Sequence, residues 1–130
     1  MPPVSARGPV VLDASAAIEA LLGEEPWVGG EDFHAHAGLD IEVVSVLRRQ
    51  TLRSQLPSHV AREALDAFGD LQITRHPLRR LIPRIWTLRD EVSAYDAGYV
   101  ALAEALGLPL LTRDGRLART ASRYCEVVVL

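Results

Sequence analysis

The chain contains no lysine, because all 14 basic residues among its 130 residues are arginine. Mechanisms that require a lysine side chain are therefore excluded. Cysteine is nearly absent as well: Cys125 is the only one, so no internal disulfide can form. Cys125 lies beside an apolar terminal run, which predicts a small buried side chain and fits a reducing, cytoplasmic compartment.

Long hydrophobic runs are also missing, since Asp, Glu, Arg or Gly interrupts every apolar stretch before it could span a membrane. The first residues, MPPVSARGPV, lack the apolar core of a signal peptide, and we expect residues 1–9 to form a short loose tail. The P-loop and dinucleotide-binding patterns do not occur. The net charge of −3 excludes a uniformly basic nucleic-acid binder. With 48% hydrophobic residues, residues 10–130 are expected to fold as a single domain.

Short β-type runs alternate with helical patterns along the chain. The patterns predict strands at 10–12, 33–36, 73–76, 109–112 and 127–130, and helices at 15–22, 39–52, 58–68, 78–88, 94–106 and 116–122. Residues 24–32 are predicted to form a loop. The second helix is expected to bury a wide face, Gly69 to stop the third, and Pro83 to kink or delay the fourth. This alternation predicts an α/β fold with three layers, in which helices flank a short-stranded parallel sheet.

Two acidic residues lie at, or just after, the carboxyl ends of predicted strands. Asp13 ends the run VVLD and Asp114 follows LLTR, and in parallel α/β folds the ligand crevice lies at the carboxyl ends of the strands. Each has a simpler explanation, because Asp13 is a good helix N-cap and Asp114-Gly115 is typical of a type I turn. Ser15 and Thr112 place hydroxyl groups near the same edge of the sheet.

Two further acidic residues lie in the first turns of predicted helices. Glu42 has apolar neighbours and is therefore expected to have a partner, although a favourable interaction with the helix dipole also explains it. Asp96 fits a capping box that begins at Ser93. Asp40 is expected to face away from Glu42 and to be solvated or capping. The four histidines lack a matching ligand group for zinc, and we interpret them as structural or exposed.

Four carboxylates that converge on one crevice repel one another unless a cation lies among them. Oxygen ligands suit Mg²⁺, which orients phosphate esters and activates water. The sequence therefore predicts a metal site at Asp13, Glu42, Asp96 and Asp114, supported by the hydroxyls of Ser15 and Thr112. Arg113 and Arg116 are candidates for contacts with phosphate groups. The tyrosines and tryptophans are expected in the core or at an interface.

These segments, taken in order, resemble the PIN domain, and within it the VapC-type toxins of bacterial toxin–antitoxin pairs. VVLDASAAIEALL, GLDIEVVSVLRR and AYDAGYVALAEALGLPLLTRDGRLA carry the resemblance, which extends over about Val10 to Leu130. Ser45 stands where the family often has asparagine, and His36-Ala37-Gly38 where many members have Ala-Pro.

The resemblance implies a PIN fold and an endoribonuclease that depends on Mg²⁺ or Mn²⁺, with Asp13, Glu42, Asp96 and Asp114 as its metal-binding acids. Glu42 would either bind the metal or position the attacking water, and Thr112 corresponds to the family's hydroxyl residue. It further implies a homodimer, a VapB-like antitoxin that covers the site and often inserts a basic side chain, and structured RNA substrates such as tRNA or rRNA.

Other classes fit the residues less well. A haloacid-dehalogenase-like phosphatase needs a second aspartate at position 15, which is Ser15, and a later lysine. A phospho-receiver domain also needs a lysine. A catalytically inactive PIN-like module that binds RNA or protein remains the alternative. The intact set of acids argues against it, because a retired site has no need to keep four carboxylates that repel one another.

Overall fold

The computed structural model describes residues 8–23 and 32–130, and these contain one parallel five-stranded sheet. The strands are β1 (Val10–Leu12), β2 (Phe33–His36), β3 (Ile73–His76), β4 (Leu110–Thr112) and β5 (Val127–Val129), in the order β3-β2-β1-β4-β5. All five predicted strands are confirmed, with ends that differ by at most one residue. The central position of β1, between β2 and β4, makes its carboxyl end the middle of one edge of the sheet.

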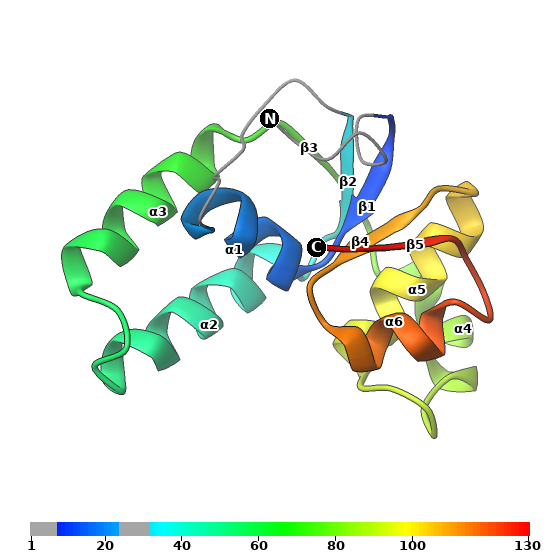
Figure 1. Ribbon diagram of the computed structural model, residues 1–130. Helices are drawn as coiled ribbons and strands as arrows, with labels where there is room; N and C mark the ends of the chain where they lie inside the picture. Colours follow the sequence, from blue (N-terminus) through cyan, green and yellow to red (C-terminus); the bar gives the residue numbers. More distant parts are fainter. Residues whose placement is uncertain (1–7, 24–31) are drawn as a thin grey trace.

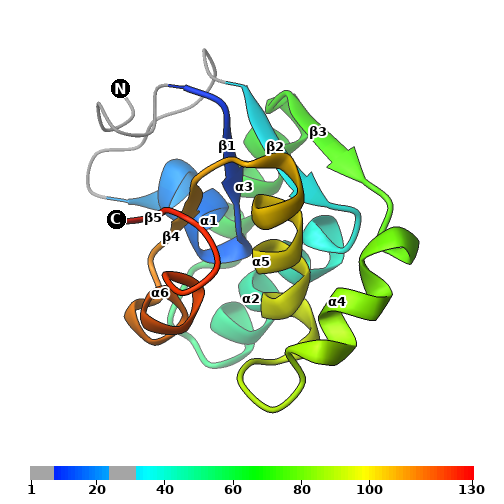
Figure 2. The same cartoon turned by 90° about the vertical axis from the view of Figure 1, so that its right-hand side faces the viewer.

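Helices cover both faces of this sheet. The described part of the chain has six α-helices and one 3-10 turn: α1 (Ala14–Leu22), α2 (Leu39–Leu52), α3 (Ser58–Asp70), η2 (Arg79–Leu81), α4 (Ile82–Thr87), α5 (Ala94–Leu106) and α6 (Gly115–Ala121). Figure 1 shows α1, α2 and α3 on one side of the sheet and α4, α5 and α6 on the other. In the turned view α5 crosses in front of β1 and β2 (Figure 2). The predicted three-layer α/β architecture is confirmed.

The core lies between the central strands and the two helices that pack on them. All residues of β1 and β4 are buried, as expected for strands covered on both faces. Helix α1 turns four alanines inward, and α5 buries every residue from Ala97 to Ala103. These small side chains let both helices lie close to the sheet, which brings their first turns near its carboxyl edge. None of the described helices combines the length and apolar character that a membrane span requires.

The third and fourth helices differ from their predicted bounds. Gly69 does not stop α3, which continues to Asp70, and the N-cap residue of α3 is Pro57. Because Pro57 has extended backbone angles and no capping side chain, Ser58 becomes the first helical residue. Pro83 delays α4, which is one of the two predicted effects: a 3-10 turn comes first, and the proline occupies the first turn of α4, where its missing N–H costs nothing.

The prediction of a wide buried face on α2 was wrong. Leu39, Val43 and Leu47 are buried at i, i+4 and i+8, but the second apolar set is exposed: Ile41 by 64%, Val44 by 42% and Leu52 by 68%. Ile41 and Leu52 are thus mostly exposed, and Val44 lines a groove between α2 and α3. The predicted burial of Cys125 is also incomplete, since the side chain is only half-buried; this burial raises its pKa to about 11. The expected tail at residues 1–7, the predicted loop at residues 24–31 and Trp27 lie outside the described residues.

Candidate active site

Four acidic side chains meet in one cleft at the carboxyl edge of the sheet. Asp13 follows β1, Glu42 lies in the first turn of α2, Asp96 lies in the first turn of α5, and Asp114 follows β4. All four line a cleft of about 540 Å³, which we call the acidic cleft. Ser15 and Arg113 line it as well. The sequence-predicted acids are therefore brought together, from four elements that are far apart along the chain.

Asp13 is the most buried of the four acids, with 4% of its surface exposed. Its Oδ1 accepts hydrogen bonds from the Ala16 backbone N–H at 2.9 Å and from the Ser15 hydroxyl at 2.7 Å. Its Oδ2 accepts one from the Thr112 hydroxyl at 2.5 Å. Asp13 thus caps α1, as the simpler explanation predicted, and lines the acidic cleft at the same time. Three fixed donors hold its carboxylate in one orientation.

Thr112 connects the two acids that follow the central strands. Its hydroxyl donates to Asp13 and accepts a hydrogen bond from the Asp114 backbone N–H at 3.0 Å. Asp114 Oδ1 accepts from the backbone N–H groups of Arg116 and Leu117 at 2.9 and 3.2 Å, so this residue is the N-cap of α6. The simple turn that the Asp-Gly pair predicted is therefore a helix cap. Oδ2 of Asp114 accepts no hydrogen bond from the described residues.

Glu42 is paired with a residue that the sequence does not indicate as part of the site. The Tyr99 hydroxyl donates to Glu42 Oε1 at 2.6 Å, and the Tyr99 side chain is fully buried. The sequence pattern predicts only a core or interface position for Tyr99. The available signal is its position on α5 three residues after Asp96, which places both side chains on one face of the helix. Asp40, in contrast, forms an ion pair with Arg75 at 2.7 Å, away from the acidic cleft.

His36 connects the elements that carry Glu42 and Asp96. Its Nδ1 accepts the Gly38 backbone N–H at 2.9 Å, so the ring proton lies on Nε2, which donates to the Tyr95 carbonyl at 3.1 Å. The ring also stacks on Tyr99 with centroids 3.9 Å apart. Burial lowers the pKa of His36, which fits this neutral form. His36 has the structural role that the sequence predicted, at the junction of β2, α2 and α5.

Substitution of Gly98 by alanine should disturb this junction. A Cβ atom at Gly98 would lie 2.7 Å from Cδ2 of His36, and the buried ring is held by both nitrogens and by Tyr99, so it cannot move aside. We expect Gly98→Ala to lower the free energy of unfolding by about 1–3 kcal/mol in denaturant titration. The matched control is Gly69→Ala in α3, where no atom lies within 4 Å and alanine should stabilise by about 0.5–1 kcal/mol. Equal effects at both positions would contradict the packing role of Gly98.

The acidic cleft raises the pKa values of three of its carboxyl groups. Burial is the largest cause for Asp13, Glu42 and Asp96 alike. The hydroxyls of Thr112 and Tyr99 oppose this effect at Asp13 and Glu42 by stabilising the charged forms. Negative charge on neighbouring members of the cleft adds to the rise in every case. The carboxylates are therefore close enough to repel one another, and a bound cation would relieve this repulsion.

Because the pKa of Asp96 is raised, we expect the wild-type protein in EDTA to lose stability through this group as the pH rises. The folded protein binds this proton more tightly than the unfolded chain, so the charge of Asp96 destabilises the fold increasingly as pH rises above about 4 and through the raised pKa. The difference in melting temperature between Asp96→Asn and the wild type should therefore grow with pH, by about 2–4 °C after allowance for solvent screening. The pKa values of His36 and His76 are lowered, so these two groups raise stability as the pH rises. They do so equally in the wild type and in Asp96→Asn and therefore do not affect the difference between them.

Scanning calorimetry between pH 4 and pH 8 tests this prediction. Saturating Mg²⁺ should stabilise the wild type and reduce the benefit of the substitution. Asp66→Asn, which removes a charge from the exposed surface of α3, should follow the wild type at every pH. If the difference in melting temperature between Asp96→Asn and the wild type is the same at every pH, Asp96 does not experience the burial and the charge repulsion of the cleft.

The donor set of the acidic cleft fits a hard divalent cation. All four acids offer oxygen, and no histidine or cysteine of the described residues lines the cleft. Among residues 8–23 and 32–130, no three acidic, histidine or cysteine side chains are already grouped as ligands of one ion. Hydrogen bonds from hydroxyl and backbone groups orient the carboxylates of Asp13, Glu42 and Asp114. Such a set suits an ion that keeps several of its waters and takes few carboxylates directly, as Mg²⁺ does.

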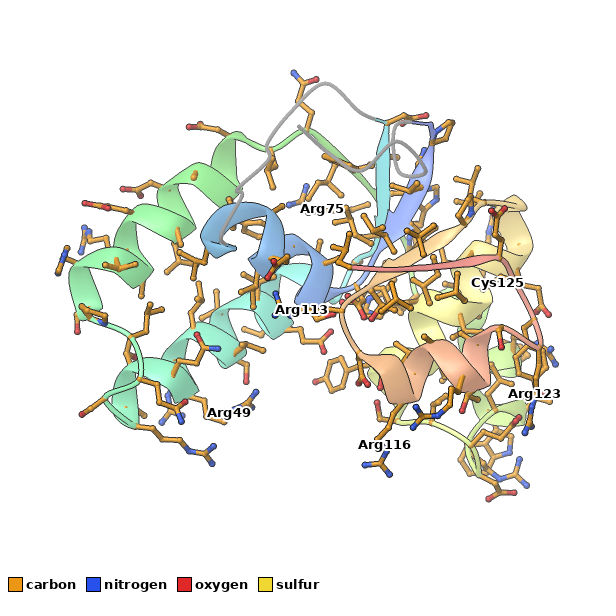
Figure 3. The ribbon with its side chains drawn as sticks, in the orientation of Figure 1. Arg49, Arg75, Arg113, Arg116, Arg123 and Cys125 are labelled. Atoms are coloured by element: carbon orange, nitrogen blue, oxygen red, sulfur yellow. The ribbon has the colours of Figure 1, made fainter. Side chains whose placement is uncertain are left out.

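The two arginines beside Asp114 have different surroundings. The Arg113 guanidinium forms an ion pair with Glu19 of α1, and its backbone N–H donates to the Ser15 hydroxyl at 2.9 Å. Arg116 is exposed and has no hydrogen-bond or ion-pair partner for its side chain among the described residues. In Figure 3, Arg113 lies beside α1, whereas Arg116 extends from α6. Of the two residues predicted to contact phosphate, only Arg116 has an unpaired side chain.

Comparison with known proteins shows which family this chain belongs to. The family description "PIN domain" matches residues 10–123 of the chain. The chain belongs to the PIN-domain family. This PIN domain is 42% identical over 124 residues to Ribonuclease VapC9 of Mycobacterium tuberculosis, a match that covers 93% of this chain and 98% of the relative. It is 37% identical over 124 residues to Ribonuclease VapC12 of the same species, with 91% and 96% covered.

Solved structures share the fold of this PIN domain at lower sequence identity. PAE2754 from Pyrobaculum aerophilum matches with a TM-score of 0.68 and 18% identity, covering 92% of this chain and 90% of that one. VapBC-5 of M. tuberculosis, a member of the VapBC family of toxin–antitoxin systems, matches with a TM-score of 0.57 and 20% identity, covering 94% and 98%. The predicted PIN-like fold is thereby confirmed.

Proposed function

We propose that the chain is a Mg²⁺- or Mn²⁺-dependent endoribonuclease that acts as the toxin of a type II toxin–antitoxin pair. The convergence of Asp13, Glu42, Asp96 and Asp114 on the acidic cleft carries this proposal. The identity of 37–42% to VapC9 and VapC12, over almost their whole length, supports RNA as the polymer that is cut. The reaction is hydrolysis of a phosphodiester bond.

Each of the four acids that line the acidic cleft has a role in this proposal. Asp13, Asp96 and Asp114 would hold the cation directly or through water, and Glu42 would bind it or position the attacking water. The cation would neutralise the cleft, orient the phosphodiester and lower the pKa of a bound water. Thr112 and Ser15 fix the carboxylate of Asp13, and Tyr99 fixes that of Glu42.

Protein partners are part of the proposal as well. A VapB-like antitoxin would inhibit the enzyme by covering the acidic cleft, and the exposed apolar side chains of α2 (Ile41, Val44 and Leu52) offer a surface beside it for such a chain. A homodimer is supported by Ile82 and Trp86 of α4, which are exposed by 56% and 66%. The substrate would be a structured RNA, tRNA or rRNA, in the cytoplasm.

A catalytically inactive PIN-like module that binds RNA or protein is the second candidate. The exposed apolar side chains just described suit this candidate as well. It does not explain why four mutually repelling carboxylates are retained with a full set of hydroxyl partners for Asp13 and Glu42.

Expression of the chain without an antitoxin in a bacterial host tests the two candidates. The wild type should arrest growth, and sequencing of RNA 5′ ends should reveal new ends at a small number of sites. Asp96→Asn, produced at the same level, should do neither. Growth arrest by both proteins without new RNA ends would favour the binding module.

A further inference from the structure

A second cleft adjoins the acidic cleft on the side of α6. It has a volume of about 590 Å³ and is lined by the segment before α5 and by one face of α6: Glu91, Val92, Ser93, Asp96, Asp114, Arg116, Leu117, Arg119, Thr120 and Arg123. We call it the arginine cleft. Asp96 and Asp114 line both clefts, so the two clefts are adjacent and meet at these carboxylates.

The positive charge of the arginine cleft is mostly unpaired. Arg116 and Arg119 are exposed, and neither side chain has a hydrogen-bond or ion-pair partner among the described residues. Their spacing of three residues places them side by side on α6. Arg123, at the other end of α6 in Figure 3, is held by Glu91 at 3.0 Å. Two arginines are therefore free to bind an anion here, whereas Arg113 is paired with Glu19.

We propose that the arginine cleft binds the RNA backbone on one side of the scissile phosphate, with Arg116 and Arg119 contacting consecutive phosphate groups. This inference rests on the proposed function. An RNA strand whose scissile phosphate lies at Asp96 and Asp114 must leave the acidic cleft, and the arginine cleft begins at these same two carboxylates. The acidic cleft repels the other phosphates of the strand, so cationic side chains next to it supply the attraction that holds the strand in place.

The contacts assigned to Arg116 and Arg119 are with phosphate, not with bases. Arginine binds phosphate oxygens through two parallel N–H groups, which fixes the path of the strand without reading its sequence. Ser93, before α5, and Thr120, on α6, also line the arginine cleft, and their hydroxyls can donate further hydrogen bonds to phosphate oxygens. The described aromatic side chains are absent from the lining, so this cleft offers no surface for base stacking.

Binding of a fluorescein-labelled single-stranded RNA of about 12 nucleotides, measured by anisotropy in EDTA, tests this proposal without cleavage. The double variant Arg116→Ala/Arg119→Ala should bind about tenfold more weakly at low salt. The slope of log K against log salt concentration should become shallower by about 1.4, because each lost phosphate contact in a single strand accounts for about 0.7. Arg116→Lys/Arg119→Lys should keep most of the slope, since the charges remain.

The matched control is Arg79→Ala/Arg80→Ala, which removes the same charge from exposed positions outside both clefts. It should keep the wild-type slope. Equal losses in the two double alanine variants would overturn the proposal, because net charge alone would then explain the binding. Wild-type affinity in Arg116→Ala/Arg119→Ala would overturn it as well.

Cleavage assays separate this inference from the proposed function. If the wild type and Arg116→Ala/Arg119→Ala cut total RNA equally well with Mg²⁺, the arginine cleft is not the strand path, and the nuclease assignment stands. The opposite result is that the wild type does not cut RNA, but Arg116→Ala/Arg119→Ala still binds RNA more weakly and with a shallower salt dependence. In that case the arginine cleft binds RNA and the nuclease assignment fails.

Discussion

Asp96→Asn is expected to lower the rate of RNA cleavage by at least about 10³-fold while the protein stays folded. The substitution removes one charge from the set that would hold the cation, and the stabilisation of a transition state by a bound cation is worth several kcal/mol. Only half of the capping box expected at Ser93 forms: the Asp96 backbone N–H donates to the Ser93 hydroxyl, and the Asp96 side chain does not cap α5. Asp13 and Asp114, in contrast, each cap a helix with their side chains, so the structure favours Asp96 for this test. The α5 cap at Ser93 uses the backbone N–H of Asp96, which asparagine retains.

Single-turnover cleavage of a defined RNA fragment measures this effect, and circular dichroism checks the fold. Asp66→Asn provides the same chemical change on the exposed surface of α3 and should cleave at the wild-type rate. A folded Asp96→Asn protein that retains more than about a tenth of the wild-type rate would remove Asp96 from the active site.

Tyr99→Phe is expected to reduce cleavage by about 10- to 100-fold, the usual cost of losing a residue that orients a metal ligand. The lost hydroxyl donates to Glu42 Oε1 at 2.6 Å, so the carboxylate would be free to rotate in the acidic cleft. The ring and its stacking on His36 remain, so the backbone of α2 and α5 should not move. The Mg²⁺ concentration required for half-maximal activity should rise together with the loss in rate.

Tyr95→Phe is the matched control, because Tyr95 lies on the same helix with 53% of its surface exposed and uses only its carbonyl to bind His36. It should leave both the rate and the Mg²⁺ requirement unchanged. If Tyr99→Phe loses stability but keeps the wild-type rate and Mg²⁺ requirement, Tyr99 supports the core and does not position Glu42.

Local sequence predicts the architecture well where one physical signal dominates. The short apolar runs at 10–12 and 110–112 are strands covered on both faces, and their buried position follows from their composition. Asp13 and Asp114 can be placed at the carboxyl edge because each comes directly after such a strand or within two residues of it. The segments that carry the four acids are also the ones in which the resemblance to the PIN domain is visible from sequence alone.

Individual side-chain contacts between distant segments could not be predicted from the sequence. The hydrogen bond from Tyr99 to Glu42 joins positions 57 residues apart. Apart from its position three residues after Asp96, nothing near Tyr99 in the sequence distinguishes it from an ordinary core aromatic. The exposed face of α2 is easily mistaken for core because periodicity shows which residues share a face, not whether another element covers it. The pairing of Arg113 with Glu19, which leaves Arg116 as the unpaired arginine of the two, likewise depends on how α1 packs beside the loop after β4.

Cleavage of total RNA by the purified chain, freed of any antitoxin, decides whether the acidic cleft is the active site of a metal-dependent ribonuclease. We expect discrete fragments in Mg²⁺ or Mn²⁺, none in EDTA, and none from Asp13→Asn or Asp96→Asn under any condition. Fragments that persist in EDTA or in both variants, or a folded wild-type protein that leaves the RNA intact with either metal, would contradict this expectation.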